Sequence, residues 1–365
     1  MHDSDRQARA EAARPQIERG KQLSVGGEHA EAASAFRQAL AIDPDNAEAY
    51  FRLGLAMRDQ QLLDEAAGCY GRAIALRPDY IEAHNNLGSV LQMQGKTDEA
   101  LACYRRAVRL GPGFPQPYLN LGRLLASRNE RDSAAAAFQS AIDRGIDVDS
   151  FRHLLSALGD QTTAHAPDEY VRNLFDNFAG DFDRRLVDEL GYRIPELLAT
   201  RIKALQPRRN LDVLDLGCGT GLCGLHLTGC CAMLTGVDLS PAMLHKARLR
   251  GCYDVLAEDD IGRWLVRPVN KVFDVVLAAD VFIYVGEIAE IFAAVSRLLA
   301  HDGLFAFSIE AAAQGDFKLQ ESGRYAHSTA YVRRLFAENG LVEVEAFAHH
   351  IRGPVDGLVF VLRRA

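Results

Sequence analysis

The chain has 365 residues, of which 48% are apolar and 25% are charged, and its formal net charge is −8 at pH 7. These fractions indicate a globular protein and exclude a disordered or collagen-like chain, while the length favours two domains because single cores stop growing near about 250–300 residues. The acidic balance argues against a protein built mainly to bind nucleic acid, and no apolar run reaches the ~20 residues of a membrane helix.

The first part of the chain repeats with a period of 34 residues. Small and aromatic residues recur in phase over four copies, and a proline recurs over three. The columns are Gly20, Gly54, Gly88 and Gly122; Ala32, Ala66, Ala100 and Ala134; Ala39, Ala73, Ala107 and Ala141; Phe36, Tyr70, Tyr104 and Phe138; and Pro44, Pro78 and Pro112. This period predicts helix–turn–helix units stacked into a solenoid, with the proline ending the second helix of a unit.

The columns resemble the tetratricopeptide repeat (TPR), with four repeats over about residues 13–148. We expect residues 149–158 to form a helix that caps the last repeat, so that an all-α TPR solenoid occupies residues 1–158. Residues 159–168 are polar and aperiodic and are predicted to be a linker. A second domain is predicted over residues 169–365.

The resemblance to TPR proteins implies a protein or peptide partner on the concave face, which the first helix of each repeat lines. Arg52, Asn86 and Asn120 occupy the same position of that helix in three repeats. An asparagine side chain carries two donors and an acceptor, so it can hold a peptide unit. The alternatives are that these side chains are solvated on the helix face, or that the solenoid only forms a homodimer.

Strands and helices alternate in the second part of the chain. Residues 169–190 have a helical pattern, and six strands are predicted after them. These strands are Asp212–Leu216, Met233–Val237, Val272–Ala278, Leu304–Ile309, Val342–Ala348 and Leu358–Leu362. The alternation predicts a mostly parallel sheet with helices on both faces. The last two strands have no helix between them and predict an antiparallel pair at one edge.

A glycine-rich loop follows the first of these strands. In the segment VLDLGCGTGLCG, Gly217, Gly219 and Gly221 permit a tight turn and let a ligand lie against bare backbone. The spacing differs from the Gly-x-Gly-x-x-Gly pattern of dinucleotide-binding proteins. Asp238, at the carboxyl end of the next strand, is placed to accept hydrogen bonds from both hydroxyls of a ribose.

Together these motifs resemble class I S-adenosylmethionine-dependent methyltransferases, from about residue 169 to the C-terminus. The resemblance implies a Rossmann-like sheet of seven strands with an antiparallel last strand, S-adenosylmethionine as cofactor, S-adenosylhomocysteine as product, and no metal. It implies that the cofactor contacts Asp215, Gly217, Cys218, Gly219, Thr220, Gly221, Asp238, Leu239, Met243, Asp260, Ile261 and Asp280. Asp259 is the alternative to Asp260 as the acid that receives the adenine amino group. Where the family has a glycine before Gly303, this chain has Asp302, a departure at a turn outside the site.

The pairing of repeats with such a domain resembles a group of predicted bacterial repeat-containing methyltransferases. The segments that carry this likeness are LFDNFAGDFD, GVDLSPAML, AADVFIYVG and SGRYAHS. The likeness implies nothing about the methyl acceptor.

Three side chains are predicted near the transferred methyl group by the order of the loops. Tyr284, Tyr325 and His327 are candidates for a general base that takes the acceptor's proton. For His327 the alternative is a structural histidine bound to a loop carbonyl, and for Tyr284 it is a hydrophobic wall over the cofactor. Arg324 is predicted either to pair with an acidic acceptor or to lie solvated at the surface.

Motifs of other chemistries do not occur in the sequence, which has no Cys-x-x-Cys, His-Glu-x-x-His or Gly-x-Ser-x-Gly segment. The seven cysteines, an odd number mostly in apolar segments, predict reduced thiols and a cytoplasmic protein. We expect a methyltransferase that acts on a protein or peptide recruited by the solenoid, with no nucleic-acid or membrane partner. The alternatives are a small-molecule O-methyltransferase for carboxylates or hydroxyls, with repeats used for dimerisation or docking, and a non-catalytic adapter that binds the cofactor.

Overall fold

The computed structural model describes residues 2–159, 161–180, 182–268, 271–353 and 355–365. The chain forms two compact units, Met1–Arg152 and His153–Ala365, and each is described by itself. The predicted end of the solenoid at residue 158 and the predicted start of the second domain at residue 169 stay predictions. Met1 of the predicted solenoid and Asp160 of the predicted linker lie outside the described residues.

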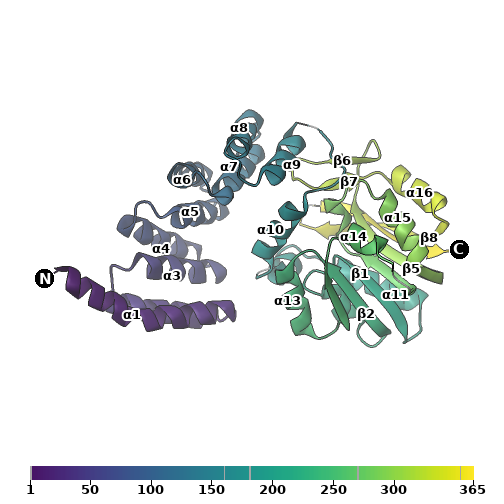
Figure 1. Ribbon diagram of the computed structural model, residues 1–365, viewed down its shortest axis with the longest axis horizontal. Coiled ribbons are helices and arrows are strands. Elements are labelled where there is room, and N and C mark those ends of the chain that lie inside the picture. Colours follow the sequence, from purple (N-terminus) through teal and green to yellow (C-terminus); the bar gives the residue numbers. More distant parts are fainter. Residues whose placement is uncertain (1, 160, 181, 269–270, 354) are drawn as a thin grey trace. The chain divides into compact units, whose positions relative to one another are not determined.

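The first unit consists of helices that pack pairwise in chain order (Figure 1). They are α1 (His2–Val25), α2 (His29–Ile42), α3 (Ala47–Asp59), α4 (Leu63–Leu76), α5 (Ile81–Met93), α6 (Thr97–Leu110), α7 (Pro115–Ser127) and α8 (Arg131–Ile142). Each proline of the repeat column lies just after a second helix, where its fixed φ and missing N–H end the helix. Helix α3 begins at a cap in which the Asn46 side chain accepts the Ala49 N–H at 2.9 Å.

Close packing of a glycine against an aromatic ring explains why these two columns keep one phase. A Cβ added at Gly54 would lie 2.7 Å from the Tyr70 ring, and one at Gly122 would lie 2.1 Å from the Phe138 ring. The rings of Tyr70 and Phe138 are buried. The first helix of each repeat must therefore carry glycine where the aromatic side chain of the second helix crosses it. The predicted solenoid of helical repeats is confirmed.

Helix α9 (Val148–Leu158) runs through the division between the units. At its start, the Phe151 ring lies 5.8 Å from the Phe138 ring and 6.4 Å from the Tyr118 ring. Phe151 is buried by these contacts, so this end of the helix covers the apolar face of the last repeat.

The second unit is built around a sheet of seven strands in the order β3-β2-β1-β4-β5-β9-β8. Its strands are β1 (Leu211–Leu216), β2 (Cys231–Asp238), β3 (Val255–Glu258), β4 (Phe273–Ala278), β5 (Leu299–Glu310), β8 (Leu341–Arg352) and β9 (Val355–Arg364). The first five strands of the chain pair in parallel, and β9 pairs antiparallel with both β5 and β8. The predicted Rossmann-like sheet with an antiparallel last strand is confirmed, and β3 is a strand that the sequence analysis did not predict.

Helices cover both faces of this sheet (Figure 1). On one face, α14 (Ile261–Val266), α15 (Ala289–Leu298) and α16 (Thr329–Glu338) pack with the strands in one apolar core. On the other face, α11 (Ile194–Leu205) and α12 (Leu222–Leu227) pack in a second core. Helix α13 (Pro241–Arg250) connects β2 to β3.

Segments outside the sheet differ from the predicted elements in two places. The helix predicted at residues 169–190 is divided into α10 (Asp168–Phe178) and the π-helical turn η1 (Arg184–Glu189), and Gly180, a poor helix former, lies in the break. A small hairpin, β6 (Phe317–Leu319) and β7 (Tyr325–His327), follows β5. Neither strand was predicted, because each has only three residues.

Candidate active site

The carboxyl ends of β1, β2, β4 and β5 form the edge at which the candidate site lies. In the sheet order, β1 has β2 on one side and β4 on the other, with Asp215 opposite both Gly236 of β2 and Leu277 of β4. The chain therefore changes direction between β1 and β4, and sheets of this type bind ligands in the crevice at such a switch point.

The glycine loop after β1 has a backbone that only glycine adopts without strain. The φ angles of Gly217, Gly219 and Gly221 are +64°, +54° and +90°, all in the left-handed region. A Cβ at Gly217 would lie 2.6 Å from Val281, whereas a Cβ at Gly219 would meet nothing within 4 Å in the described chain. Gly219 therefore borders open space into which a side chain would project, as expected of backbone that a ligand approaches.

Asp215, near the end of β1, is a buried carboxylate with an unused oxygen. Its Oδ2 accepts a hydrogen bond from the Tyr253 hydroxyl at 2.6 Å, and its Oδ1 has no partner among the described residues. The pKa of Asp215 is raised to about 7, mainly because burial disfavours the charged carboxylate. The hydrogen bond from Tyr253 lowers this pKa, whereas the negative charge of the nearby Asp238 raises it. Tyr253 was not predicted from the sequence, because nothing in its spacing indicates the contact.

Asp238, at the end of β2, is hydrogen-bonded to the backbone of the glycine loop. Its Oδ2 accepts the Gly219 N–H at 2.8 Å, and its Oδ1 accepts the Ser240 N–H at 2.8 Å. Burial raises the pKa of Asp238 to about 6, although these backbone N–H groups favour the charged form. Because each carboxylate oxygen has two lone pairs, the group retains capacity for a further pair of donors.

These raised pKa values predict a pH dependence of stability. The folded chain holds a proton on Asp215 more tightly than the unfolded chain does, so the stabilisation is present below about pH 4 and is lost as the pH rises through about 7. For this group alone the loss between pH 5 and pH 8 is about 2–3 kcal/mol. We expect the midpoint of thermal unfolding to fall over this range, and to fall less in Asp215→Asn. Parallel pH profiles for the two proteins would contradict this assignment.

Two acids follow β3, and the structure gives them different partners. Asp259 forms ion pairs with Arg263, at 3.4 Å, and with Arg267. Asp260 caps α14, because its Oδ1 accepts the Arg263 N–H at 2.9 Å, and Ile261 is the first residue of that helix. Since Asp259 is already neutralised by two arginines, the geometry favours Asp260 for a hydrogen bond to adenine.

The segment from α10 to η1 is tied to both loops of the candidate cofactor site. Asp176 accepts a hydrogen bond from the Ser240 hydroxyl at 2.5 Å, and Asp183 accepts one from the Thr220 hydroxyl at 2.5 Å. Arg250 joins this contact, since it donates to the Thr220 carbonyl at 2.6 Å and pairs with Asp183. Both acids lie in the segment LFDNFAGDFD, which carried a family likeness, but the sequence alone assigned them no contact.

Four charged side chains gather beyond the ends of β4 and β5. Arg352, the last residue of β8, pairs with Asp280 and lies 2.5 Å from Glu310, the last residue of β5. Arg324, in the β6–β7 turn, lies 3.2 Å from Glu310. The partner of Arg324 is thus a carboxylate of this chain, and the predicted pairing with an acidic acceptor stays a prediction. Glu310 and Arg352 were not predicted as site residues, because they are distant in sequence and occur in no motif.

The candidate bases differ in how the structure surrounds them. His327 is fully buried, its Nε2 lies 2.9 Å from the Gly286 carbonyl, and burial lowers its pKa to about 4. Tyr325 is also fully buried, and its hydroxyl lies 2.5 Å from the Thr163 hydroxyl. Each side chain already has one partner within the chain, so the structure gives the predicted role as a base no added support, and that role stays a prediction. The contact of His327 with a loop carbonyl agrees with the alternative predicted for it.

Tyr284 is the third candidate for a general base. It is half-buried in the short helix η2 (Phe282–Tyr284), and its ring meets the Phe175 ring of α10 edge-on at 5.2 Å. Burial raises the pKa of Tyr284 well above its usual range, so its hydroxyl keeps its proton at neutral pH. This arrangement favours the predicted wall over a base.

The remaining predicted cofactor residues lie close to the loop but face in different directions. Leu239 is half-buried next to Asp238, whereas Met243 of α13 is fully buried, and Ser240 caps its backbone N–H at 3.1 Å. Cys218 is buried, and a Cβ at Gly236 would lie 2.8 Å from its sulfur. Met243 therefore contributes to the core, and Cys218 contacts the neighbouring strand.

The predicted partner-binding residues of the solenoid have partners within the solenoid. The Asn120 side chain donates to Asn85 at 2.9 Å and accepts from Gln116 at 3.0 Å, and Asn86 accepts from Asn85 at 3.5 Å. Arg52 lies 3.6 Å from Glu48. The amides thus form a chain of side-chain hydrogen bonds along α5 and α7.

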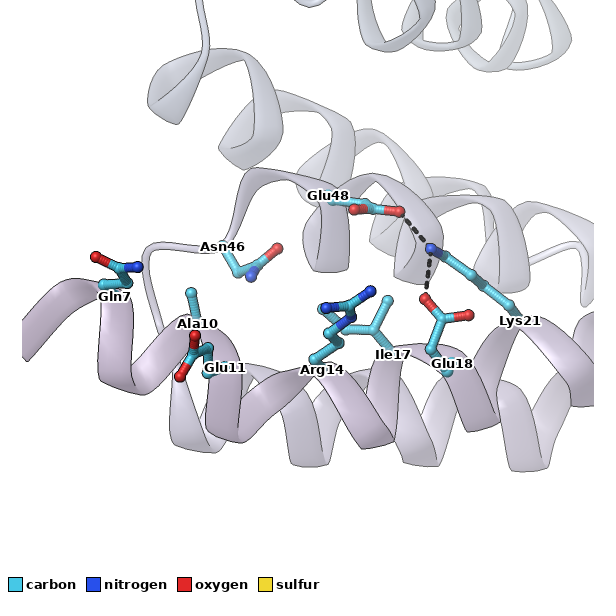
Figure 2. A pocket seen from close by; sticks show the side chains of 9 residues that line it. All are labelled: Gln7, Ala10, Glu11, Arg14, Ile17, Glu18, Lys21, Asn46 and Glu48. Atoms are coloured by element: carbon cyan, nitrogen blue, oxygen red, sulfur yellow. Dashed lines mark hydrogen bonds and ion pairs between the residues drawn. The ribbon is translucent and has the colours of Figure 1, made fainter.

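The first repeats also enclose a polar groove of about 450 Å³ (Figure 2). At one end of this groove lies Lys21 of α1, whose Nζ lies 3.0 Å from Glu18 and 2.8 Å from Glu48 of α3. Figure 2 shows Arg14 and Asn46 lining the same groove. The groove therefore offers charges of both signs.

Two kinds of site are absent from the described part of the chain. No helix there combines the length and the apolarity of a membrane span. No group of three His, Cys, Asp or Glu side chains in the same ranges lies close enough to hold a metal ion.

Comparison with known families agrees with this architecture. A family model described as a methyltransferase domain matches residues 214–305, and tetratricopeptide-repeat models match residues 20–61, 56–95 and 81–114. The matched segment of the second unit contains the glycine loop, β2, β3 and β4. This chain therefore combines TPR repeats with a class I methyltransferase domain.

Curated relatives match parts of the chain. A malonyl-[acyl-carrier protein] O-methyltransferase of Geobacter sulfurreducens is 32% identical over 154 residues, 38% of this chain and 52% of the relative. A ubiquinone biosynthesis O-methyltransferase of Bartonella quintana is 31% identical over 104 residues, 28% of this chain and 42% of the relative. The chain thus spans about half the length, or less, of these relatives. Magnesium protoporphyrin IX methyltransferase from Synechocystis PCC 6803, solved with bound SAH, is 16% identical, with a TM-score of 0.45 over 55% of this chain and 100% of that one.

Proposed function

We propose that this protein transfers the methyl group of S-adenosylmethionine to an acceptor bound beyond the ends of β4 and β5. One observation carries the proposal: an open, left-handed glycine loop lies between two buried carboxylates, Asp215 and Asp238. Buried carboxylates cost stability unless they are paired, and Asp215 keeps an oxygen that has no partner among the described residues. A ligand with a cationic amino group and a ribose supplies the donors that these oxygens lack.

The residues of the site fit S-adenosylmethionine end to end. Asp215 and the glycine loop would hold the methionine part, Asp238 the ribose and Asp260 the adenine. When bound, the sulfonium supplies a methyl group that is already activated for displacement. The protein then has to align the acceptor and exclude water. The α10 segment and the Tyr284 ring would exclude water, because that segment is hydrogen-bonded to the loops after β1 and β2, and the ring packs against Phe175 of α10.

Calorimetric titration of the full chain with S-adenosylmethionine and, separately, S-adenosylhomocysteine tests the proposal. We expect dissociation constants in the micromolar range or below, about −8 kcal/mol or more favourable. Binding of neither compound would contradict it and would leave a scaffold protein.

For the acceptor we propose a small molecule, with the solenoid binding a protein partner. One relative supports this choice, since its name refers to ubiquinone biosynthesis, whereas the malonyl group in the other name is carried by a protein. The solenoid supports it as well, because the Asn120 side chain already donates one hydrogen bond and accepts another within the chain. A protein or peptide acceptor is the second candidate, which TPR repeats favour by their usual role in protein–protein contacts. We keep a cytoplasmic location and a homodimer as predictions.

A double variant, Asn86→Ala with Asn120→Ala, separates the two candidates. Methylation of a small molecule should stay within about threefold of the unaltered protein, because the amides lie in the other unit. Turnover of a peptide held by these amides should fall about tenfold or more, since two hydrogen bonds are lost at about 0.5–1.5 kcal/mol each. The measurement is the initial rate with labelled S-adenosylmethionine. The control is an unfolding midpoint that stays above the assay temperature, because loss of the Asn120–Asn85 hydrogen bond is itself expected to lower the midpoint. A large loss with a small acceptor would contradict the proposal.

A further inference from the structure

The charged cluster of Asp280, Glu310, Arg324 and Arg352 has a place and a composition that bear on the acceptor. The cofactor half of the site, by the proposed function, lies over β1 and β2. The cluster lies over the next strands of the sheet, because Asp280 follows β4 and Glu310 ends β5. It is still next to the glycine loop, since a Cβ at Gly217 would meet the Val281 side chain at 2.6 Å.

The backbone of Asp280 is held in an unusual conformation. Its φ is +60°, in the left-handed region that costs most residues about 1–2 kcal/mol, although Asp and Asn adopt it more readily. Its N–H donates to the buried Ser308 hydroxyl at 2.9 Å. Such strain persists only where the surroundings fix it, and it fixes the direction of the carboxylate.

The two oxygens of Asp280 are treated differently. Oδ2 pairs with Arg352, whereas Oδ1 is buried and has no hydrogen-bond partner in the described chain. The side chain is 12% exposed. An acceptor oxygen without a donor in such a place costs about 1–3 kcal/mol, so a ligand that donates there gains this amount back.

Arg352 is the side chain that holds the cluster together. It is 6% exposed and bridges Asp280 and Glu310 through its two terminal nitrogens. Burial opposes its charge, but the two carboxylates outweigh burial and raise the pKa of Arg352. With Arg324 on Glu310, two guanidinium groups face two carboxylates, and the cluster is neutral overall.

Charge balance decides which acceptors fit. An anionic carboxylate finds no uncompensated positive charge here, because both arginines are already paired, and it meets the lone pairs of Asp280 Oδ1. A hydroxyl or a neutral amine carries the donor that this oxygen lacks. We infer that Asp280, held by Arg352 and Glu310, accepts the hydrogen bond of the reacting hydroxyl or amine, so that the acceptor is an alcohol, phenol or amine and not a carboxylate. This inference rests on the proposed function and moves Asp280 from the predicted cofactor contacts to the acceptor.

The proposed methyl transfer conserves atoms and charge. The acceptor oxygen or nitrogen forms a bond to the methyl carbon while the carbon–sulfur bond breaks and its electron pair stays on sulfur. The acceptor proton passes to Asp280 Oδ1 and then to water. One positive charge disappears from sulfur and one proton is released. In this scheme Asp280 is catalytic, whereas Arg352 and Glu310 are positioning residues.

The first test is the isosteric variant Asp280→Asn in the full chain. Its affinity for S-adenosylmethionine, measured by calorimetry, should stay within about threefold. Its kcat/KM for the acceptor should fall about a hundredfold or more, in the range of general-base contributions. Asp274→Asn is the matched control, because Asp274 is an ion-paired acid, 2.8 Å from Arg208, at the opposite end of β4 from Asp280. A fall in cofactor affinity of tenfold or more in Asp280→Asn would overturn the inference and assign this acid to the cofactor.

The second test reads the acceptor class directly. The unaltered protein and labelled S-adenosylmethionine are incubated with benzyl alcohol, catechol, benzylamine, benzoate and malonate, and products are split into base-stable and base-labile methyl groups. Label in base-stable ethers or N-methyl products is the expected result. Label only in base-labile esters, or in no member of the panel, overturns the inference while cofactor binding still stands. Loss of cofactor binding by the unaltered protein would instead contradict the proposed function.

The positioning role of Arg352 has its own signature, a pH profile. The groups around Asp280 are Arg352 of β8, Glu310 of β5, Arg324 of the β6–β7 turn, Tyr192 before α11 and Tyr284 of η2. Without the guanidinium, Asp280 should hold its proton to higher pH. We expect the acid limb of kcat/KM to move upward by about one pH unit or more in Arg352→Gln and to return partly in Arg352→Lys. A loss of equal size at every pH would show only a structural role.

Discussion

Replacing Asp238 with alanine is expected to weaken binding of S-adenosylmethionine by at least about a hundredfold. Asp238 accepts the N–H groups of Gly219 and Ser240 and is the proposed acceptor for two ribose hydroxyls. Hydrogen bonds to a charged group contribute about 1.5–3 kcal/mol each, so the loss of two corresponds to two or more powers of ten in affinity. Calorimetry with the full chain measures it.

The same variant should remain folded, which separates lost binding from unfolding. Burial raises the pKa of Asp238 to about 6, so the charged group is a cost to the ligand-free fold at neutral pH. Its removal relieves that cost and leaves two backbone N–H groups without their acceptor, and the two effects oppose each other. Glu258→Ala is the matched control, because Glu258 ends the neighbouring strand β3 but is exposed. Affinity within threefold of the unaltered protein would refute the role of Asp238.

Local patterns in the sequence were sufficient to predict most of the fold. The repeat columns fix the solenoid because Gly54 must lie under Tyr70 and every copy needs the same contact. Strand β4 was predicted within one residue of its bounds, whereas β5 begins five residues before the predicted strand. Strand β3 has only four residues, half-buried or exposed, so its sequence has no apolar run to reveal it. At the family's glycine position, Asp302 takes φ +62° itself, which explains why the turn survives the substitution.

The candidate site was predictable where a motif lies in one segment, and not where it depends on tertiary contacts. Asp215, the glycines and Asp238 follow strand ends, so their proximity follows from a parallel sheet. The pairing of Asp280 with Arg352 joins residues 72 positions apart and depends on how β8 lies in the sheet. His327 was a candidate because polar residues surround it in sequence. The β6–β7 hairpin buries it, and no local pattern signals that burial.

A second large effect is expected from Gly219→Asn, which tests whether the open space at the loop is the ligand's place. Gly219 has φ +54°, and a Cβ there meets nothing within 4 Å of the described chain. Asparagine tolerates this left-handed backbone better than other side chains do, so the fold should accept it. Its amide would project into the space where S-adenosylmethionine is proposed to lie. We expect affinity to fall by more than about a hundredfold in calorimetry.

Gly229→Asn is the control that makes this result specific. Gly229 has φ +81°, an equally open Cβ position and an exposed backbone after α12, away from the glycine loop. Both variants carry the same backbone strain, so their unfolding midpoints should fall by similar amounts, whereas only Gly219→Asn should lose the ligand. Affinities that stay at the value of the unaltered protein in both variants would place S-adenosylmethionine elsewhere. Equal losses of affinity would show that strain in the fold, and not obstruction of the ligand, governs binding.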